Sequence, residues 1–266
     1  MSSLVLCDIH NDVARVTLNR PDKRNGLSRD LVLELIQTAN KLAKNRELRA
    51  VIISGEGEVF CSGLDFASWG KKPSKMLLGF LKPVSDTNLF QEVAWCWRKL
   101  QVPVVVVTHG VCFGGGLQIA LGADFRFSTP DCQFSIMEAK WGLIPDMTGT
   151  VTLRELMPMD KAKELTMTGR IFDAIEARAL NLVTEISENP MDDAEALVAE
   201  IVTRSPDSVA ATKALFHKTW AGSESKALRQ ESILQAKLLL GRNHGIARKA
   251  NMAKKLPDFV RRRFDY

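Results

Sequence analysis

Residues 99–128 read KLQVPVVVVTHGVCFGGGLQIALGADFRFS. The apolar run VPVVVVTH predicts a buried strand, because β-branched residues favour extended backbone and the run is too short to cross a membrane. Three consecutive glycines follow, then LQIALGA, which predicts a short helix, and DFRFS, which predicts another strand. Strand, glycine turn, helix and strand in this order indicate an α/β fold.

The flanking sequence continues the alternation of strands and helices. Segments 4–10 and 13–19 are apolar and are separated by Asn11-Asp12, a turn pair that predicts a β-hairpin. Ser28 is a suitable N-cap for an amphipathic helix over 28–45, and AVIIS at 50–54 predicts a buried strand. Residues 66–83 suggest an irregular lid, and residues 85–100 suggest a helix. From 159 onward the pattern is predominantly helical.

Composition narrows the class of protein. The chain has 266 residues, 45% of them hydrophobic, and a net charge of +5 that is concentrated near the C-terminus. No nucleic-acid-binding signature accompanies this charge, so we expect either a solvated helical face or a strip that binds a small polyanion, and no nucleic acid. The N-terminal residues lack the pattern of a secretory signal, and five scattered cysteines indicate reduced thiols, so we expect a cytoplasmic protein without membrane contact. His and Cys spacings match no metal site.

The triple glycine is typical of a place where the backbone approaches a ligand. FGGGLQ at 113–118 lacks the GK[ST] ending of a P-loop and the spacing of GxGxxG. Two uses remain open: an oxyanion hole made of backbone N–H groups, or a tight packing corner between strand and helix. A second glycine turn, FCSGLD at 60–65, also follows a predicted strand and could supply a second donor.

Four segments together resemble the crotonase superfamily, the enoyl-CoA hydratases and isomerases. They are NRPDKRNGLS at 19–28, FCSGLDF at 60–66, the quoted stretch 99–128 and ARALNLVTEI at 177–186, and they follow the family's order and spacing. The resemblance implies an α/β fold, a crotonase-like spiral of repeated ββα units at 1–200, followed by a C-terminal helical trimerisation region at 201–266 that belongs to the same functional unit. It also implies a homotrimer or homohexamer.

The resemblance further implies a coenzyme A thioester as substrate, with no metal and no cofactor beyond that CoA. It places the oxyanion hole at the backbone N–H groups of Ser62 and Gly115. The residues that it suggests for CoA binding are Lys23, Arg24, Asn25, Leu27, Ser62, Gly63, Leu64 and Asp65, together with Lys255, Phe259 and Arg262 from a neighbouring subunit. The basic C-terminus would then face the phosphates of CoA.

The expected catalytic residues are two carboxylates and Gln118, which departs from the hydratase pattern. Hydratases of the family commonly use two glutamates, but the first position here is Gln118, which cannot accept a proton near neutral pH. Glu138 stands at the second position, and Asp146 follows eight residues later, a spacing that resembles the dienoyl-CoA isomerases. We therefore expect an enzyme that shifts a double bond in an enoyl- or dienoyl-CoA.

Several alternatives stay open. The chain could be a hydratase that works with Glu138 alone, a dehalogenase with an aspartate nucleophile, or a non-catalytic binder of CoA thioesters or RNA. The dehalogenase would need a histidine near Phe90 or Gln91, where none stands. Asp146 could instead cap the helix that follows it, and His109 is expected to be structural. The residues that could line an acyl pocket, or simply pack in the core and lid, are Trp69, Met76, Leu77, Phe80, Leu81 and Phe90.

Overall fold

A computed structural model describes residues 3–69, 78–81 and 86–266. The valine-rich strand β4 (Val104–Thr108) lies inside a six-stranded sheet with the order β1-β2-β3-β4-β6-β9. The other strands of this sheet are β1 (Val5–His10), β2 (Val13–Leu18), β3 (Ala50–Gly55), β6 (Phe125–Ser128) and β9 (Glu185–Ile186). β1 and β2 form the expected antiparallel hairpin, and the other neighbours are parallel.

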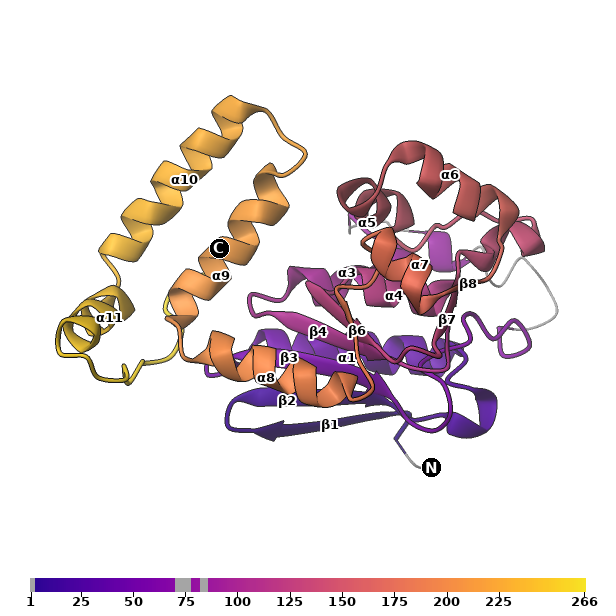
Figure 1. Ribbon diagram of the computed structural model, residues 1–266, viewed down its shortest axis with the longest axis horizontal. Coiled ribbons are helices and arrows are strands. Elements are labelled where there is room, and N and C mark those ends of the chain that lie inside the picture. Colours follow the sequence, from indigo (N-terminus) through magenta and orange to yellow (C-terminus); the bar gives the residue numbers. More distant parts are fainter. Residues whose placement is uncertain (1–2, 70–77, 82–85) are drawn as a thin grey trace.

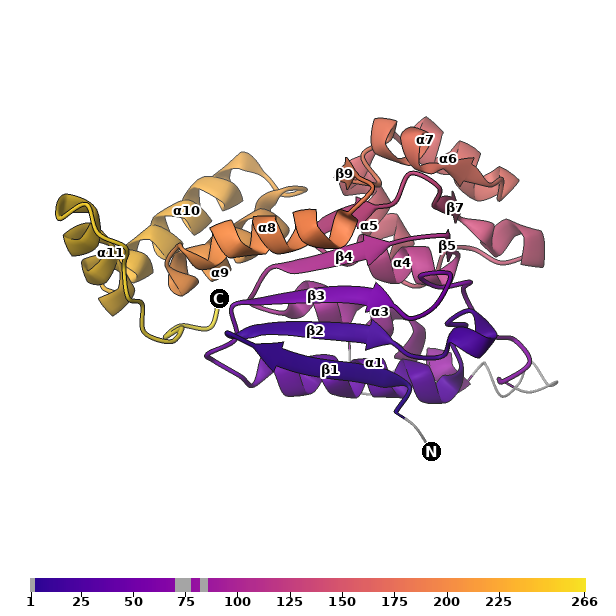
Figure 2. The same cartoon turned by 60° about the horizontal axis from the view of Figure 1, so that its bottom comes forward.

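Helices cover both faces of this sheet, which explains the uninterrupted run of valines in β4 (Figures 1 and 2). Val104 and Val106 belong to the main core, which they share with α1 (Arg29–Ala43) and α3 (Leu89–Lys99). Val105 and Val107 belong to a second cluster that packs against α8 (Pro190–Val202). A strand buried on both faces needs apolar residues at every position.

A second, three-stranded sheet completes the predicted spiral. β4 continues into β5 (Val111–Phe113) and α4 (Gly115–Leu121), while β6 continues into β7 (Gln133–Ser135), the 3-10 helix η3 (Met137–Trp141) and α5 (Gly149–Leu156). β5 and β7 pair with each other and with β8 (Phe172–Asp173) in the order β5-β7-β8. These two turns of the chain each place one strand in each sheet before a helix, whereas the first turn places β1 and β2 in the larger sheet before α1, so the chain consists of repeated ββα units as predicted.

Element boundaries differ from the predictions at three places. α3 begins at Leu89, where the side chain of Asn88 caps the helix and Gln91 completes a capping box, and not at residue 85, which lies outside the described residues. α4 begins two residues earlier than expected, at Gly115. The short strands β8 and β9 interrupt the predicted helical last third, because two-residue strands carry too few side chains to show a period.

The remaining helices are two 3-10 helices of the first third of the chain and the α-helices that follow α5. They are η1 (Pro21–Lys23), η2 (Leu78–Phe80), α6 (Met159–Thr168), α7 (Ala174–Ala179), α9 (Pro206–Thr219), α10 (Glu224–Leu239) and α11 (Arg242–Met252). α9 and α10 pack as an antiparallel pair that extends away from the larger sheet (Figure 1). Among the described helices, none combines the length and the apolar character needed to cross a membrane.

Candidate active site

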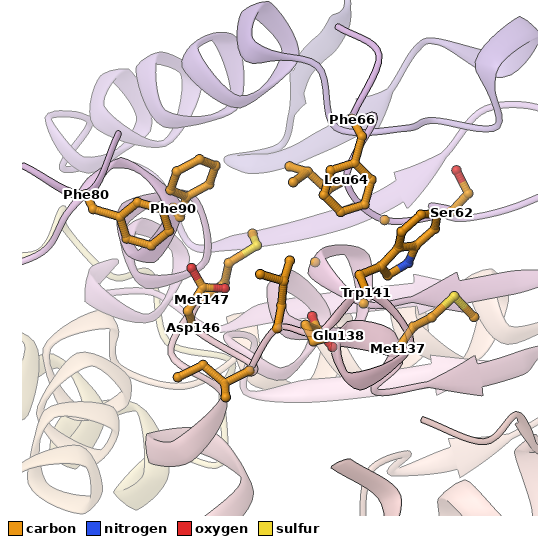
Figure 3. Close-up of a pocket in the computed structure, with 15 residues that line it drawn as sticks. Ser62, Leu64, Phe66, Phe80, Phe90, Met137, Glu138, Trp141, Asp146 and Met147 are labelled. Atoms are coloured by element: carbon orange, nitrogen blue, oxygen red, sulfur yellow. The ribbon is translucent and has the colours of Figure 1, made fainter. Parts of the chain in front are cut away.

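A largely apolar cavity of about 400 Å³ lies beside the glycine-rich corner. Figure 3 shows the carboxylates of Glu138 and Asp146 on one side of it, with Leu64 and Phe66 on the other. The lining residues come from the loop after β3, from η2, α3 and η3, and from the turns that precede α4 and α5: Ser62, Gly63, Leu64, Phe66, Phe80, Phe90, Gly114, Gly115, Met137, Glu138, Trp141, Leu143, Ile144, Asp146 and Met147.

The two glycine turns meet at this cavity because their backbones are hydrogen-bonded to each other. Cys61 N–H donates to the Val111 carbonyl, and Phe113 N–H donates to the Cys61 carbonyl, and the N···O distance is 3.0 Å in both. Beyond this bridge the chains stay close: a Cβ added at Gly63 would lie 3.7 Å from Gly115 N. The expected convergence of the two turns is therefore confirmed by the structure.

The donor on the first turn is not the one predicted. Ser62 N–H donates to the Arg24 carbonyl over 3.0 Å, so it is not available to a substrate oxygen, and Figure 3 shows its hydroxyl pointing away from both carboxylates. Leu64 forms a parallel bridge with Leu27, in which Gly63 O and Asp65 N make the hydrogen bonds. The N–H of Leu64 therefore points to the opposite side and has no acceptor among the described residues. Leu64 replaces Ser62 as the candidate donor.

The donor on the second turn agrees with the prediction. Gly115 is the first residue of α4, and its N–H has no acceptor within the described part of the chain. Gly114 has φ 49°, and a Cβ added at Gly116 would come within 2.7 Å of Cys61 Cβ. Both glycines are therefore required by geometry, one for its backbone angle and one for the close approach of the loops. A free backbone donor and a tight packing corner therefore coexist at the same three glycines.

Glu138 is a buried carboxylate with one oxygen held and one free. It lies in η3 and is only 8% exposed. Its Oε1 accepts a hydrogen bond from Gln118 Nε2 at 2.6 Å, whereas its buried Oε2 has no hydrogen-bond partner in the described structure. Burial raises the pKa of Glu138, while its own backbone N–H and the Gln118 amide oppose that rise. The free oxygen can accept a proton from a group bound in the cavity.

Gln118 contacts Glu138 and does not line the cavity. It is 2% exposed on α4, and its Oε1 accepts the N–H groups of Met147, at 2.9 Å, and Gly149, at 3.2 Å. The catalytic role assigned to Gln118 from its position is therefore indirect, because Glu138 stands between it and any bound group.

Asp146 is half-buried at the edge of the cavity, and burial raises the pKa of its carboxyl. It does not cap α5, because the N-cap position is Thr148, which has φ 74° and makes no side-chain cap hydrogen bond. The charge of Asp146 also raises the pKa of Glu138, and this effect is smaller than those of burial and of the two hydrogen bonds. Two carboxyls with raised pKa values at one cavity are typical of proton-transfer sites.

The residues suggested for the CoA nucleotide divide into exposed and buried ones. Lys23 and Arg24 are exposed, and the carbonyl of Arg24 accepts the Ser62 N–H, so their backbone lies next to the first glycine turn. Asn25 is fully buried, and its amide donates to the carbonyls of Glu56 and Val59. Leu27 is a fully buried core residue. The side chains of Asn25 and Leu27 therefore serve the fold, and CoA binding at these two positions stays a prediction that concerns their backbone.

The other suggested CoA ligands lie farther from the cavity or are already paired. Asp65 forms an ion pair with Arg20 at 2.7 Å. Lys255 and Phe259 follow α11, at the opposite end of the chain's long axis from β7, so they do not reach this chain's own cavity (Figures 1 and 2). Arg262 is only 4% exposed, so its side chain is enclosed by this chain's own residues.

The sequence predicted only some of the apolar residues that line the cavity. Phe80 and Phe90 line the cavity, with ring centroids 4.8 Å apart, but Trp69 is buried behind them and Leu81 is exposed. Met76 and Leu77 lie outside the described residues. The missed lining residues are Phe66, Met137, Trp141, Leu143, Ile144 and Met147. Four of these apolar residues fall within the turn-rich stretch 141–147, beside Gly142 and Pro145, and this clustering was a sequence signal that could have identified the second wall. In the structure Trp141 and Ile144 are more than half exposed, as residues of an interaction site often are.

The cysteines and histidines near the site are structural. Burial raises the pKa of Cys61 to about 12, and that of Cys112 also rises with burial, so neither forms a thiolate near neutral pH. His109 is hydrogen-bonded through Nε2 to the Gly57 carbonyl at 2.9 Å. Among the described residues, no group of His, Cys, Asp and Glu side chains has the arrangement of a metal site.

Comparisons with known proteins lead to one enzyme family. The profile of the enoyl-CoA hydratase/isomerase family matches residues 8–258. The peroxisomal Delta(3,5)-Delta(2,4)-dienoyl-CoA isomerase of Arabidopsis thaliana is 28% identical over 260 residues, 94% of each chain. Enoyl-CoA hydratase EchA19 of Mycobacterium tuberculosis is also 28% identical, over 93% of this chain and 92% of its own. An enoyl-CoA hydratase structure from Mycobacterium smegmatis superposes with a TM-score of 0.86 at 25% identity, covering 97% and 99% of the two chains.

Proposed function

Since the chain belongs to the enoyl-CoA hydratase/isomerase family, we propose that it shifts a double bond in an enoyl- or dienoyl-CoA. The observation that carries the proposal is the pairing of Glu138 and Asp146, two carboxyls with raised pKa values, while the third polar side chain of the cluster is the neutral Gln118. Isomerisation needs a carboxylate that removes a proton from one carbon and a carboxyl, the same one or a second, that returns a proton to another carbon, and no water molecule enters the products.

The backbone donors would stabilise the charge that this reaction develops. The thioester oxygen would accept the N–H groups of Leu64 and Gly115, both of which lack an acceptor in the described structure. Glu138 Oε2 would take a proton from C2, and the electron pair would spread over the conjugated chain and the thioester oxygen as an enolate. Return of the proton to a more distant carbon, by Glu138 or by Asp146, gives the isomer, so that atoms and charge balance.

The alternative within the family is hydration with Glu138 alone. Its support is that hydratases are as similar to this chain as the dienoyl-CoA isomerase is. In that case Glu138 would both activate water and supply the proton for C2. The neutral Gln118 makes hydration the less favoured function, because an amide cannot act as an acid or base toward water near neutral pH.

A spectrophotometric screen separates these functions. Isomerisation of 3-enoyl- or 3,5-dienoyl-CoA should create ultraviolet absorbance, because the double bond becomes conjugated with the thioester. Hydration of crotonyl-CoA should remove such absorbance. We expect the rate with the best isomerase substrate to exceed that of hydration by at least about tenfold, a ratio set by one missing acid–base group. Equal rates would reverse the order of the two functions, and absence of both, with acyl-CoA still bound, would support the non-catalytic binder.

The C-terminal helices support a proposal about assembly. α9, α10 and the segment between α10 and α11 expose large apolar side chains on a hairpin that stands away from the sheet (Figure 1): Phe216, Trp220, Leu228, Ile233, Leu239 and Leu240. Apolar surface of this kind marks interaction sites. We therefore expect a trimer or a dimer of trimers, in which Lys255 and Phe259 approach a neighbour's CoA. Light scattering at micromolar concentration tests this, and a monomer would contradict it.

A further inference from the structure

The orientation of the Gln118 amide is determined by its neighbours. Its Oε1 faces two backbone N–H groups, those of Met147 and Gly149. N–H groups only donate, so the atom that they face must be the carbonyl oxygen of the amide, and the NH₂ group must then face Glu138 Oε1, 2.6 Å away. Gln118 is 2% exposed, so water does not compete for these contacts.

One amide therefore connects both carboxylate-bearing segments. Its NH₂ group holds the carboxylate in η3, and its oxygen holds the N–H groups of Met147 and Gly149, in the turn that follows Asp146. The packing is tight, because a Cβ added at Gly149 would come within 2.9 Å of the same oxygen. No other side chain among the described residues hydrogen-bonds to the Glu138 carboxylate.

We infer that Gln118 is a positioning residue that holds Oε1 of the Glu138 carboxylate, leaves its Oε2 to the cavity and holds the Asp146 turn beside it. The inference rests on the proposed function for its catalytic meaning. A donor to Oε1 stabilises the carboxylate form and opposes the effect of burial on its pKa. An ionised glutamate at position 118 could not donate, and two carboxylates at this separation would have to share a proton. With glutamine at position 118, Glu138 does not share its proton with a second carboxyl at that position.

Two substitutions separate the contacts of the amide. Gln118→Glu keeps an oxygen for the Met147 and Gly149 N–H groups and changes only the group that faces Glu138. Gln118→Met removes both contacts while keeping an unbranched side chain of similar length. Gln37→Leu changes an exposed glutamine on α1 and serves as the control.

The pH profile of turnover is the decisive measurement. Activity needs ionised Glu138, so it is lost as the pH falls through the pKa of that carboxyl. Gln118→Met should shift this acidic limb to higher pH, because the donor that stabilises the carboxylate is gone, whereas Gln118→Glu should replace the limb by the titration of two carboxyls that share a proton. In both variants kcat at neutral pH should fall about tenfold to a hundredfold. Binding of butyryl-CoA, which has no double bond to move, should change less than threefold or so, because Gln118 does not line the cavity.

A second readout does not depend on the isomerase reaction. Exchange of the butyryl-CoA α-protons with deuterated water reports proton removal by Glu138 alone, and its acidic limb should shift in the same way. A wild-type protein that exchanges these protons but isomerises nothing would overturn the proposed function and leave the role of Gln118 intact. Unshifted limbs in both variants, with folding verified by circular dichroism, would make Gln118 an ordinary core residue and overturn the inference.

Discussion

Replacing Glu138 by glutamine is expected to lower turnover about a hundredfold to ten-thousandfold, the usual contribution of a positioned general base. The substitution is a clean one, because the new side-chain oxygen can still accept the Gln118 Nε2 hydrogen bond that Oε1 accepts now. Only the ability to take a proton is lost. Acyl-CoA binding should remain nearly intact, so kcat should fall and the dissociation constant should not.

The same variant should unfold at a higher temperature near neutral pH. Burial raises the pKa of Glu138, so the folded protein binds this proton more tightly than the unfolded chain does. Wild-type stability therefore decreases as the pH rises from the ordinary glutamate pKa through the raised value in the folded state. Glutamine carries no such cost, and the difference between the two proteins should vanish in acid.

Glu188→Gln is the matched control, since Glu188 is an exposed glutamate. Steady-state kinetics and thermal unfolding of both variants at several pH values make the comparison. Turnover of the Glu138 variant within about threefold of wild type would show that Glu138 is not the proton carrier, since a base worth so little is not positioned. Asp146→Asn would then be the variant to measure.

Gly63→Ala should produce the second large effect, a loss of about a hundredfold to a thousandfold in turnover. Gly63 has φ 94°, and a Cβ there would lie 3.0 Å from the Phe113 carbonyl oxygen. Relief of this contact must move the peptide that carries the Leu64 N–H relative to Gly115. Removing one oxyanion donor typically costs that much in kcat.

Gly142→Ala separates this steric effect from backbone strain. Gly142 has φ 70°, also in the left-handed region, but a Cβ added there meets nothing within 4 Å. Both variants should lose some stability, about 1 kcal/mol from the backbone conformation, while only the Gly63 variant should lose most of its turnover. If a folded Gly63→Ala protein keeps turnover comparable to that of the control, the Leu64 N–H is not an oxyanion donor.

The sequence alone was sufficient for features that depend on neighbouring residues. The valines of β4, the Ser28 cap of α1 and the Asn11-Asp12 hairpin turn each follow from local side-chain chemistry, and the structure has all three. The spacing of the motifs also singled out Glu138 and Asp146, and both line one cavity in the structure. Local patterns persist because period, caps and turns act within a few residues.

Features that depend on long-range pairing needed the tertiary structure. Whether Ser62 or Leu64 presents a free N–H depends on which of them faces Leu27, and that is decided by a bridge between segments nearly forty residues apart in sequence. Asn25 and Arg262 look like ligands for phosphate groups until packing buries them.

The role of Gln118 shows the same division. The sequence shows that a glutamine stands where hydratases have a glutamate. Only the fold places the N–H groups of Met147 and Gly149 against its oxygen, and this directs its NH₂ group toward Glu138. An amide has a donor side and an acceptor side, and the chain on either side of position 118 does not distinguish them. The sequence by itself thus determined which groups are present, and the tertiary structure decided which way they point, because hydrogen bonds have direction and hydrophobic patterning does not.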